Sequence, residues 1–230
     1  VFTGDLGRPN DLVMLAPETV QKADFLVVES TYGDRVHDPL SVFDQLAEVI
    51  DRTVKRGGTV VIPAFSVGRS QALLFALSIL KKEERIRKVP IYLDSPMSIE
   101  ATNILCRYQT ETRLSPAQCQ AVTTVARYVH EQEESKSLDT RKDPMVIISA
   151  SGMATGGRVL HHLKRFVTDA RNTVLFAGYQ AIGTRGAQML MGAESVKIHG
   201  EQFPVAAEIV NIDNLSAHMD SQEILDWLSH

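Results

Sequence analysis

Residues 59–82 read TVVIPAFSVGRSQALLFALSILKK, and this stretch predicts the fold. Thr59–Ala64 is a short, nearly unbroken apolar run rich in β-branched residues, which is typical of a strand buried on both faces of a parallel sheet. A turn that contains Gly68 follows, and the apolar pattern of Ser70–Lys82 then predicts a helix. Strand, turn and helix in this order are the repeating unit of an α/β protein.

The same unit recurs along the chain. Further strands are expected at Phe25–Glu29, Ile91–Asp94, Met145–Ala150 and Thr173–Gly178. Further helices are expected at Ser41–Arg56, Met97–Tyr108, from Ser115-Pro116 onward, and at Val159–Thr168. The charged stretch Glu131–Asp143 is expected to be an exposed helix end and loop. We therefore predict an α/β fold with a doubly wound, mostly parallel sheet and helices on both faces.

Composition limits the kinds of partner. Hydrophobic residues make up 44% of the chain and charged residues 23%, as in a globular domain. The apolar runs are far too short to cross a bilayer, so we expect no membrane association. The formal net charge is −4, so any nucleic-acid binding must use a local positive site. Cys106 and Cys119 lack metal-site spacing and suit buried thiols in the cytoplasm.

Several predicted strands are followed directly by loops rich in Gly, Ser, Thr and Arg. These loops are Phe65–Arg69, Ser95–Met97, Ser151–Arg158 and Tyr179–Gly186. Because the carboxyl ends of parallel strands share one edge, the loops should gather where ligands of open α/β sheets bind.

The residue types in these loops suit phosphate. Glycine lets the backbone approach a ligand closely, and free N–H groups at helix starts favour anions. Arg69, Arg158 and Arg185 would add charge and bidentate geometry. A single strand–glycine loop–helix is also a generic connector, and Gly183 and Gly186 could simply permit tight turns.

Two further residues are candidates for acid–base chemistry. Glu29 ends a predicted strand, and His218 lies just before a helix that Asp220 and Glu223 would cap and that runs to Leu228. A histidine oriented by a carboxylate can act as general acid or base near neutral pH. Taken singly, His218 also fits a surface histidine near a cap, and Glu29 a solvated turn acid.

The other histidines are weaker candidates. His161 and His162 are adjacent on a predicted helix and point about 100° apart, which is poor geometry for sharing a metal. His37, His130 and His230 have no partner pattern. A turn between two strands explains His199-Gly200-Glu201 as well as a site motif does.

Taken together, the motifs resemble the β-CASP family of metallo-β-lactamase-fold nucleases. They are Phe2–Asp5, Glu29–Gly33, Pro63–Arg69, Leu93–Met97, Ser151–Gly157, Gly178–Thr184 and Ser216–Asp220. The family contains the nuclease subunit of the cleavage and polyadenylation machinery and its bacterial and archaeal relatives. The resemblance covers essentially the whole chain, in order.

This resemblance implies a nuclease in which a β-CASP domain is inserted into a metallo-β-lactamase domain that holds two zinc ions, with single-stranded RNA in the cleft between them. Residues 34–211 would be the β-CASP domain, and residues 1–33 and 212–230 parts of the other. Asp5 looks like the aspartate that bridges both zincs. Glu29 and His218 look like the pair beside the scissile phosphate, with His218 as general acid. The RNA-binding positions would be Ser66, Gly68, Arg69, Ser151, Gly152, Thr155, Gly156, Gly157, Tyr179, Gln180, Gly183, Thr184 and Arg185.

The sequence also departs from the family pattern. None of its seven histidines forms the HxHxDH zinc motif, and the family's third β-CASP histidine has no counterpart after His218. His199 precedes His218 and is not that ligand. Of the expected zinc ligands only Asp5 is present, whereas catalytic zinc normally has three protein ligands. We therefore expect the isolated chain to be an inactive fragment of a zinc-dependent ribonuclease.

Two alternatives remain open. One is a non-catalytic RNA-binding or scaffolding relative, since some family members have degraded metal sites. The other, weaker one is a hydrolase of a small ester or thioester. In each case we expect residues 1–33 and 212–230 to leave an apolar face open that encourages homodimer formation.

Overall fold

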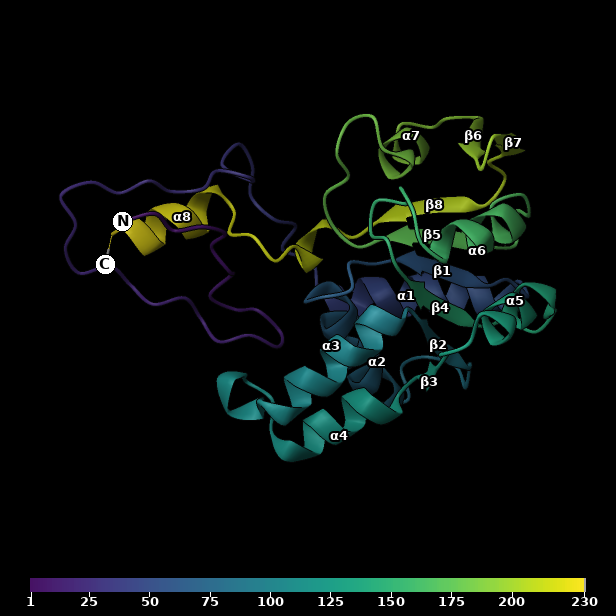
Figure 1. Cartoon of the computed structure of the whole chain (residues 1–230), viewed down its shortest axis with the longest axis horizontal. Helices are drawn as coiled ribbons and strands as arrows, with labels where there is room; N and C mark the ends of the chain where they lie inside the picture. Colours follow the sequence, from purple (N-terminus) through teal and green to yellow (C-terminus); the bar gives the residue numbers. More distant parts are fainter. Residues whose placement is uncertain (230) are drawn as a thin grey trace.

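Six parallel strands form the central sheet of the computed structural model, which describes residues 1–229 (Figure 1). Each neighbouring pair is parallel, which confirms the predicted fold class. Across the sheet the strands are β3 (Arg127–Tyr128), β2 (Ile91–Asp94), β4 (Val146–Ser149), β1 (Val60–Pro63), β5 (Thr173–Phe176) and β8 (Glu208–Asn211).

Helices cover both faces of this sheet. One face packs against α1 (Val42–Lys55), α2 (Arg69–Lys82), α3 (Pro96–Arg107) and α4 (Pro116–Thr124). The other packs against α5 (Gln132–Thr140), α6 (Val159–Phe166), α7 (Arg185–Leu190) and the antiparallel hairpin of β6 (Ser195–Ile198) and β7 (Glu201–Pro204).

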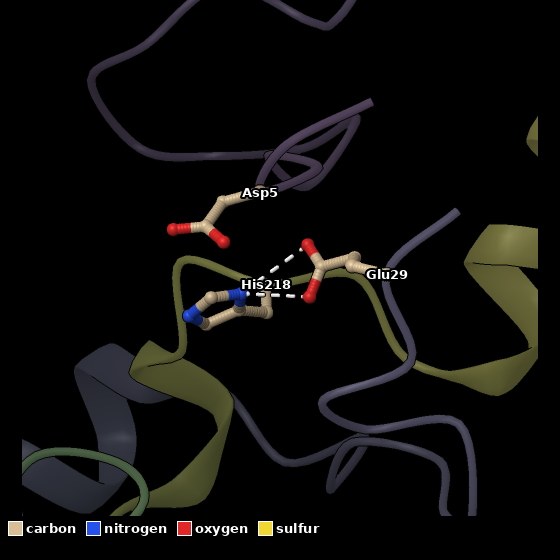
Figure 2. Close-up of side chains that lie close together, drawn as sticks. All are labelled: Asp5, Glu29 and His218. Atoms are coloured by element: carbon tan, nitrogen blue, oxygen red, sulfur yellow. Dashed lines mark hydrogen bonds and ion pairs between the residues drawn. The ribbon is translucent and has the colours of Figure 1, made fainter. Parts of the chain in front are cut away.

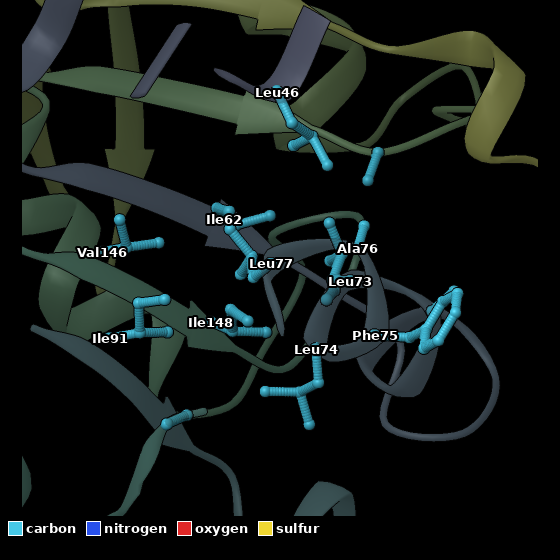
Figure 3. Close-up of a cluster of buried hydrophobic side chains, with 14 of the residues drawn as sticks. Leu46, Ile62, Leu73, Leu74, Phe75, Ala76, Leu77, Ile91, Val146 and Ile148 are labelled. Atoms are coloured by element: carbon cyan, nitrogen blue, oxygen red, sulfur yellow. The ribbon is translucent and has the colours of Figure 1, made fainter. Parts of the chain in front are cut away.

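The core is divided by the alternation of side chains along each strand. Ile62 of β1 lies in the cluster with α2 (Figure 3). The adjacent Val61 lies in the other cluster, with α6. Both side chains are fully buried. Burial of a side chain of this size contributes roughly 1.5–3 kcal/mol. This two-sided burial is why the strands are apolar throughout and were predictable from sequence.

The structure differs from the sequence-based expectations at three places, and the strand expected at Phe25–Glu29 is wrong. Phe25–Glu29 forms no strand, because among the described residues only the segment 1–3 pairs with it, through one isolated bridge between Phe2 and Val27. Glu131–Asp143 contains the helix α5, whose buried residues are Ser135 and Leu138, too few to give a clear apolar pattern. The elements β3, β8, α7 and the β6–β7 hairpin were also not predicted, although His199 and Gly200 do form the expected turn.

The two ends of the chain lie together beside the sheet (Figure 1). Leu6 packs with Met219, Ile224 and Trp227 of the segment that ends in α8 (Ser221–Leu228). Asp220 and Glu223 form the predicted capping box of α8. Two short 3₁₀ helices, Gln109–Glu111 and Asp213–Leu215, complete the structure. No helix among residues 1–229 is long and apolar enough to cross a membrane.

Candidate active-site cleft

A cleft of about 570 Å³ lies where the loops after the strands meet the paired ends of the chain. Because the strands are parallel, their carboxyl ends place these loops at one edge of the sheet. Six of the residues predicted for the site line the cleft: Asp5, Ser66, Arg69, Ser151, Tyr179 and His218. The structure therefore brings the acid–base residues and part of the phosphate loops into one space.

Glu29 and His218 form a hydrogen-bonded pair (Figure 2). The Nδ1 atom of His218 lies 2.9 Å from Oε2 and 3.2 Å from Oε1 of Glu29. The His218 side chain is 29% exposed and the Glu29 side chain 9%, so the acid is largely enclosed while the imidazole reaches the cleft. With Nδ1 held by Glu29, Nε2 is the ring nitrogen left to meet a ligand.

The protein holds Glu29 in its ionised form. Burial raises the pKa of Glu29, but hydrogen bonds from the Thr31 hydroxyl (2.6 Å), the Leu6 amide and His218 outweigh it and lower the pKa below its ordinary value. The carboxylate therefore accepts a hydrogen bond from Nδ1 and orients the imidazole.

A second set of contacts fixes the backbone at His218. The ring of His37, which was not predicted to have a partner, donates from Nε2 to the carbonyl oxygen of His218 at 3.0 Å. The carboxylate of Asp220 accepts the backbone N–H of His37 at 2.8 Å and also caps α8. Arg8 forms an ion pair with Glu223 at 2.9 Å, which ties the first residues of the chain to the same helix.

Asp5 is exposed in the cleft beside this pair. Asp5, Glu29 and His218 each place one candidate ligand atom within 4.8 Å of the others. The oxygens of Glu29 are already bonded to Leu6, Thr31 and His218. Within residues 1–229, Asp5 and Nε2 of His218 are thus the free donors, which is fewer than the three protein ligands of a catalytic zinc. These residues alone do not fit a zinc centre of two ions.

Arg69 supplies an unpaired positive charge to the cleft wall. Burial lowers the pKa of Arg69 to about 10, while the nearby Tyr32 and Asp11 raise it. Its buried Nη1 atom has no hydrogen-bond acceptor among the described residues. A buried guanidinium without an acceptor is costly unless a ligand supplies one. Arg69 is therefore the strongest candidate in the chain for binding an anionic group.

Gly178 leaves the space that Arg69 occupies. Its φ is +112°, a conformation that side-chain-bearing residues rarely adopt, and a Cβ atom there would lie 2.4 Å from Nη1 of Arg69. Beside it, the ring of Tyr179 stands edge-on to that of Tyr32 with centroids 6.2 Å apart. The loop after β5 thus shapes the same cleft wall.

Other predicted phosphate-binding residues form hydrogen bonds within and between the loops. The Ser151 hydroxyl accepts the amides of Thr155 and Gly156 at 3.1 and 3.2 Å. Gln180 donates to the carbonyl oxygen of Gly152 at 3.1 Å and so joins two loops. Gly68 lines a neighbouring, more apolar pocket of about 440 Å³. Direct ligand contact by these residues stays a prediction.

The remaining glycine-rich residues line a separate hollow. Thr155, Gly156, Gly157, Gly183, Thr184 and Arg185 surround a space of about 600 Å³ away from His218. The sequence could not show which residues of these two loops line the cleft and which line the second hollow, because both sets are interleaved in the loops Ser151–Arg158 and Tyr179–Gly186.

Arg158 does not have the phosphate-binding position suggested by the sequence. Its Nη1 atom donates to Asp94 at 2.7 Å, and Nη2 donates to the carbonyl oxygen of His130 at 2.8 Å. Asp94 also accepts Nε2 of His162 at 2.7 Å, while Nδ1 of His162 faces Asp139 at 2.6 Å. Arg158 is thus drawn into a buried ionic network that the sequence did not reveal, because its members lie far apart along the chain.

Comparison with known proteins identifies the family. A sequence profile described as the Beta-Casp domain matches residues 70–189. The chain belongs to the β-CASP family.

This β-CASP chain is similar to several curated proteins. It is 37% identical to "Ribonuclease TTHA0252" of Thermus thermophilus, over 99% of the chain and 54% of that protein. It is 30% identical to an "RNase J-like protein" of Methanocaldococcus jannaschii, again over 99% of the chain and 54% of that protein. It is 32% identical to "Transcription termination factor FttA" of Pyrococcus horikoshii, over 99% of the chain and 37% of that protein. The chain thus spans about half the length of these relatives or less.

Proposed function

We propose that this β-CASP chain is part of a zinc-dependent ribonuclease that hydrolyses phosphodiester bonds of single-stranded RNA. The observation that carries the proposal is the cleft in which the Glu29–His218 pair, Asp5 and the unpaired Arg69 lie together. Relatives named as ribonucleases support the substrate class.

The geometry supports a role for each of these residues. A phosphate of the substrate would accept hydrogen bonds from the guanidinium of Arg69, whose Nη1 atom has no acceptor among residues 1–229. As water attacks the phosphorus and the P–O bond to the leaving oxygen breaks, His218 would give the proton on Nε2 to that oxygen, while Glu29 holds the ring through Nδ1. Binding of two zinc ions would require further ligands from outside residues 1–229, because Asp5 and His218 are fewer than the three protein ligands of a catalytic zinc.

Cleavage by the full-length protein tests this function. With end-labelled single-stranded RNA, His218→Ala should lower kcat by roughly 10²–10⁴, the usual contribution of a general acid. Glu29→Gln should give a smaller loss, since it leaves the imidazole in place. His130→Ala is the matched control, because His130 is exposed and only its backbone contacts Arg158. A wild-type kcat in His218→Ala would refute the assignment.

The isolated chain should not cleave RNA. Incubation of residues 1–230 with labelled RNA and excess zinc should leave the RNA intact, because Asp5 alone cannot hold a catalytic zinc tightly. Metal-dependent cleavage that survives Asp5→Asn would contradict this prediction.

One observation keeps a second function open. The incomplete donor set of residues 1–229 is also what a non-catalytic RNA-binding relative would show. Full-length protein that binds RNA but leaves it uncut in zinc would favour that function over the nuclease.

A further inference from the structure

A second hollow lies beside the cleft, and two loops separate them. Ser151 and Tyr179 line the cleft, whereas Gly156 and Gly183, from the same two loops, line the hollow of about 600 Å³. We call this hollow the hairpin groove, because β6 of the β6–β7 hairpin contributes Lys197 to it. Figure 1 shows the hairpin, α6 and α7 gathered on this side of the sheet. The two loops therefore form a ridge between two concave surfaces.

The hairpin groove carries positive charge in a chain that is negative overall. Lys197 lies between the buried Val196 and Ile198 of β6, so its side chain is on the exposed face of the strand. His199, in the turn that follows β6, is also exposed. Arg185 adds a third basic group, and no Asp or Glu lies among the described residues that line the groove. The chain as a whole has a net charge of −4, so this concentration of basic groups is local.

Arg185 and Lys197 line the groove but differ in their contacts: hydrogen bonds hold Arg185, whereas Lys197 has no ion-pair partner within residues 1–229. The guanidinium of Arg185 donates to the carbonyl oxygens of Lys197 (2.5 Å) and Ala154 (3.1 Å), which holds it in the floor. The ammonium of Lys197 has no ion-pair partner within residues 1–229. The ring of His199 lies beside that of His161 of α6, with centroids 5.0 Å apart and the ring planes tilted by 46°.

Glycine leaves the backbone of the groove open. A Cβ atom added at Gly156, Gly183 or Gly200 would meet no atom within 4 Å, so free space lies directly above the main chain. An open main chain beside lysine and arginine is a surface that a phosphate can approach closely. On the ridge itself, Tyr179 is 43% exposed and Ile182 is 91% exposed, which offers an aromatic and an apolar surface to bases.

Building on the proposed function, we propose that the hairpin groove binds the sugar–phosphate backbone of the same RNA strand, at nucleotides remote from the scissile phosphate. The strand leaves the cleft, crosses the ridge past Tyr179, and reaches Lys197 and His199. Arg69 binds RNA of any length, whereas the groove contributes only when the RNA is long enough to cross the ridge.

Binding of short and long RNA to this chain tests the inference. Fluorescent oligouridylates of about 4 and about 16 nucleotides cover the range of common single-strand site sizes. We expect Lys197→Ala combined with His199→Ala to raise the Kd of the long RNA by about fivefold or more, and to leave the short RNA unchanged. The salt slope for the long RNA should fall by about 0.7 for each lost phosphate contact. Lys88→Ala, an exposed lysine in the loop before β2, should change neither.

The outcomes separate this inference from the proposed function. If the double variant leaves the long RNA unchanged, or weakens both lengths equally, the hairpin groove is not a remote RNA site, while a loss of binding in Arg69→Ala would still support the cleft. If the wild-type chain binds neither RNA, the hairpin-groove inference fails, whereas the proposed function is decided by RNA cleavage with the full-length protein.

Discussion

At the scale of single residues, the cleft depends on a cation that the protein leaves without a partner. Arg69 is enclosed by its own fold and yet one of its nitrogens finds no acceptor among residues 1–229. Its place exists because Gly178 has no side chain and adopts a positive φ. Both residues lie in motifs identified from the sequence, but only the structure showed that the missing side chain of Gly178 leaves room for Arg69.

Gly178→Ala should therefore disturb Arg69 as well as the backbone. The new Cβ would lie 2.4 Å from Nη1, so Arg69 must move, and we expect a loss of about 1–3 kcal/mol in the free energy of unfolding and weaker RNA binding. Gly192→Ala is the control, because Gly192 also has a positive φ (+82°) but no atom within 4 Å of the new Cβ. Urea unfolding and an RNA titration measure the two effects. Equal RNA affinity in both variants would show that Gly178 does not position Arg69.

At the scale of secondary-structure elements, a buried network joins β2, α5 and α6. Asp94 ends β2 and accepts hydrogen bonds from Ser135 of α5 (2.5 Å), His162 of α6 (2.7 Å) and Arg158 (2.7 Å). Burial lowers the pKa of His162, but hydrogen bonds to Asp139 and Asp94 outweigh it and raise the pKa to about 9. This network explains why α5 forms from a sequence with few apolar residues.

The protonated state of His162 predicts a pH dependence of stability. A raised histidine pKa stabilises the fold fully below the unfolded value of about 6.5 and loses that contribution as the pH rises through about 9. Between these values the free energy of unfolding of the wild type should fall by roughly 3 kcal/mol more than that of His162→Gln. At pH 6 the variant should itself be less stable by about 3 kcal/mol, because Asp94 and Asp139 lose the charged group that lies between them.

Chemical denaturation at pH 6, 7.5 and 9 checks this prediction. His161→Gln is the neighbouring control, since His161 lies on the exposed side of α6. Parallel pH profiles for wild type and His162→Gln would mean that the network does not hold His162 in its charged form.

At the scale of the whole molecule, the first residues of the chain leave an apolar face open. Phe2, Phe25 and Val27 are 82%, 84% and 52% exposed, whereas the alternate residues Leu26 and Val28 pack beside α8. The segments 1–3 and 25–27 pair through the Phe2–Val27 bridge, so these three side chains share one face. Because the chain spans about half of its similar relatives or less, we propose that the rest of a metallo-β-lactamase domain covers this face, with the boundaries near residues 33 and 211.

The isolated chain should therefore associate through that face. Sedimentation velocity at rising concentration should show a dimer for the wild type and a monomer for Phe25→Glu, because a charge in the apolar face opposes its burial. Ile182→Glu, which places the same charge at an exposed apolar residue in the loop after β5, should leave the dimer unchanged. A monomeric wild type would contradict the prediction.

The sequence by itself determined the strand–loop–helix order, the helix caps and the residues at the strand ends. These features depend on neighbours a few positions away, as in the buried run Val60–Pro63 or the Asp220–Glu223 box. Only the tertiary structure decided which loops share the cleft and that the glycine-rich loops line two separate hollows. It also decided that Arg158 bonds to Asp94 and not to a ligand. Those outcomes depend on packing between residues far apart in the chain, where side chains compete for the same partners, and no local pattern records the result.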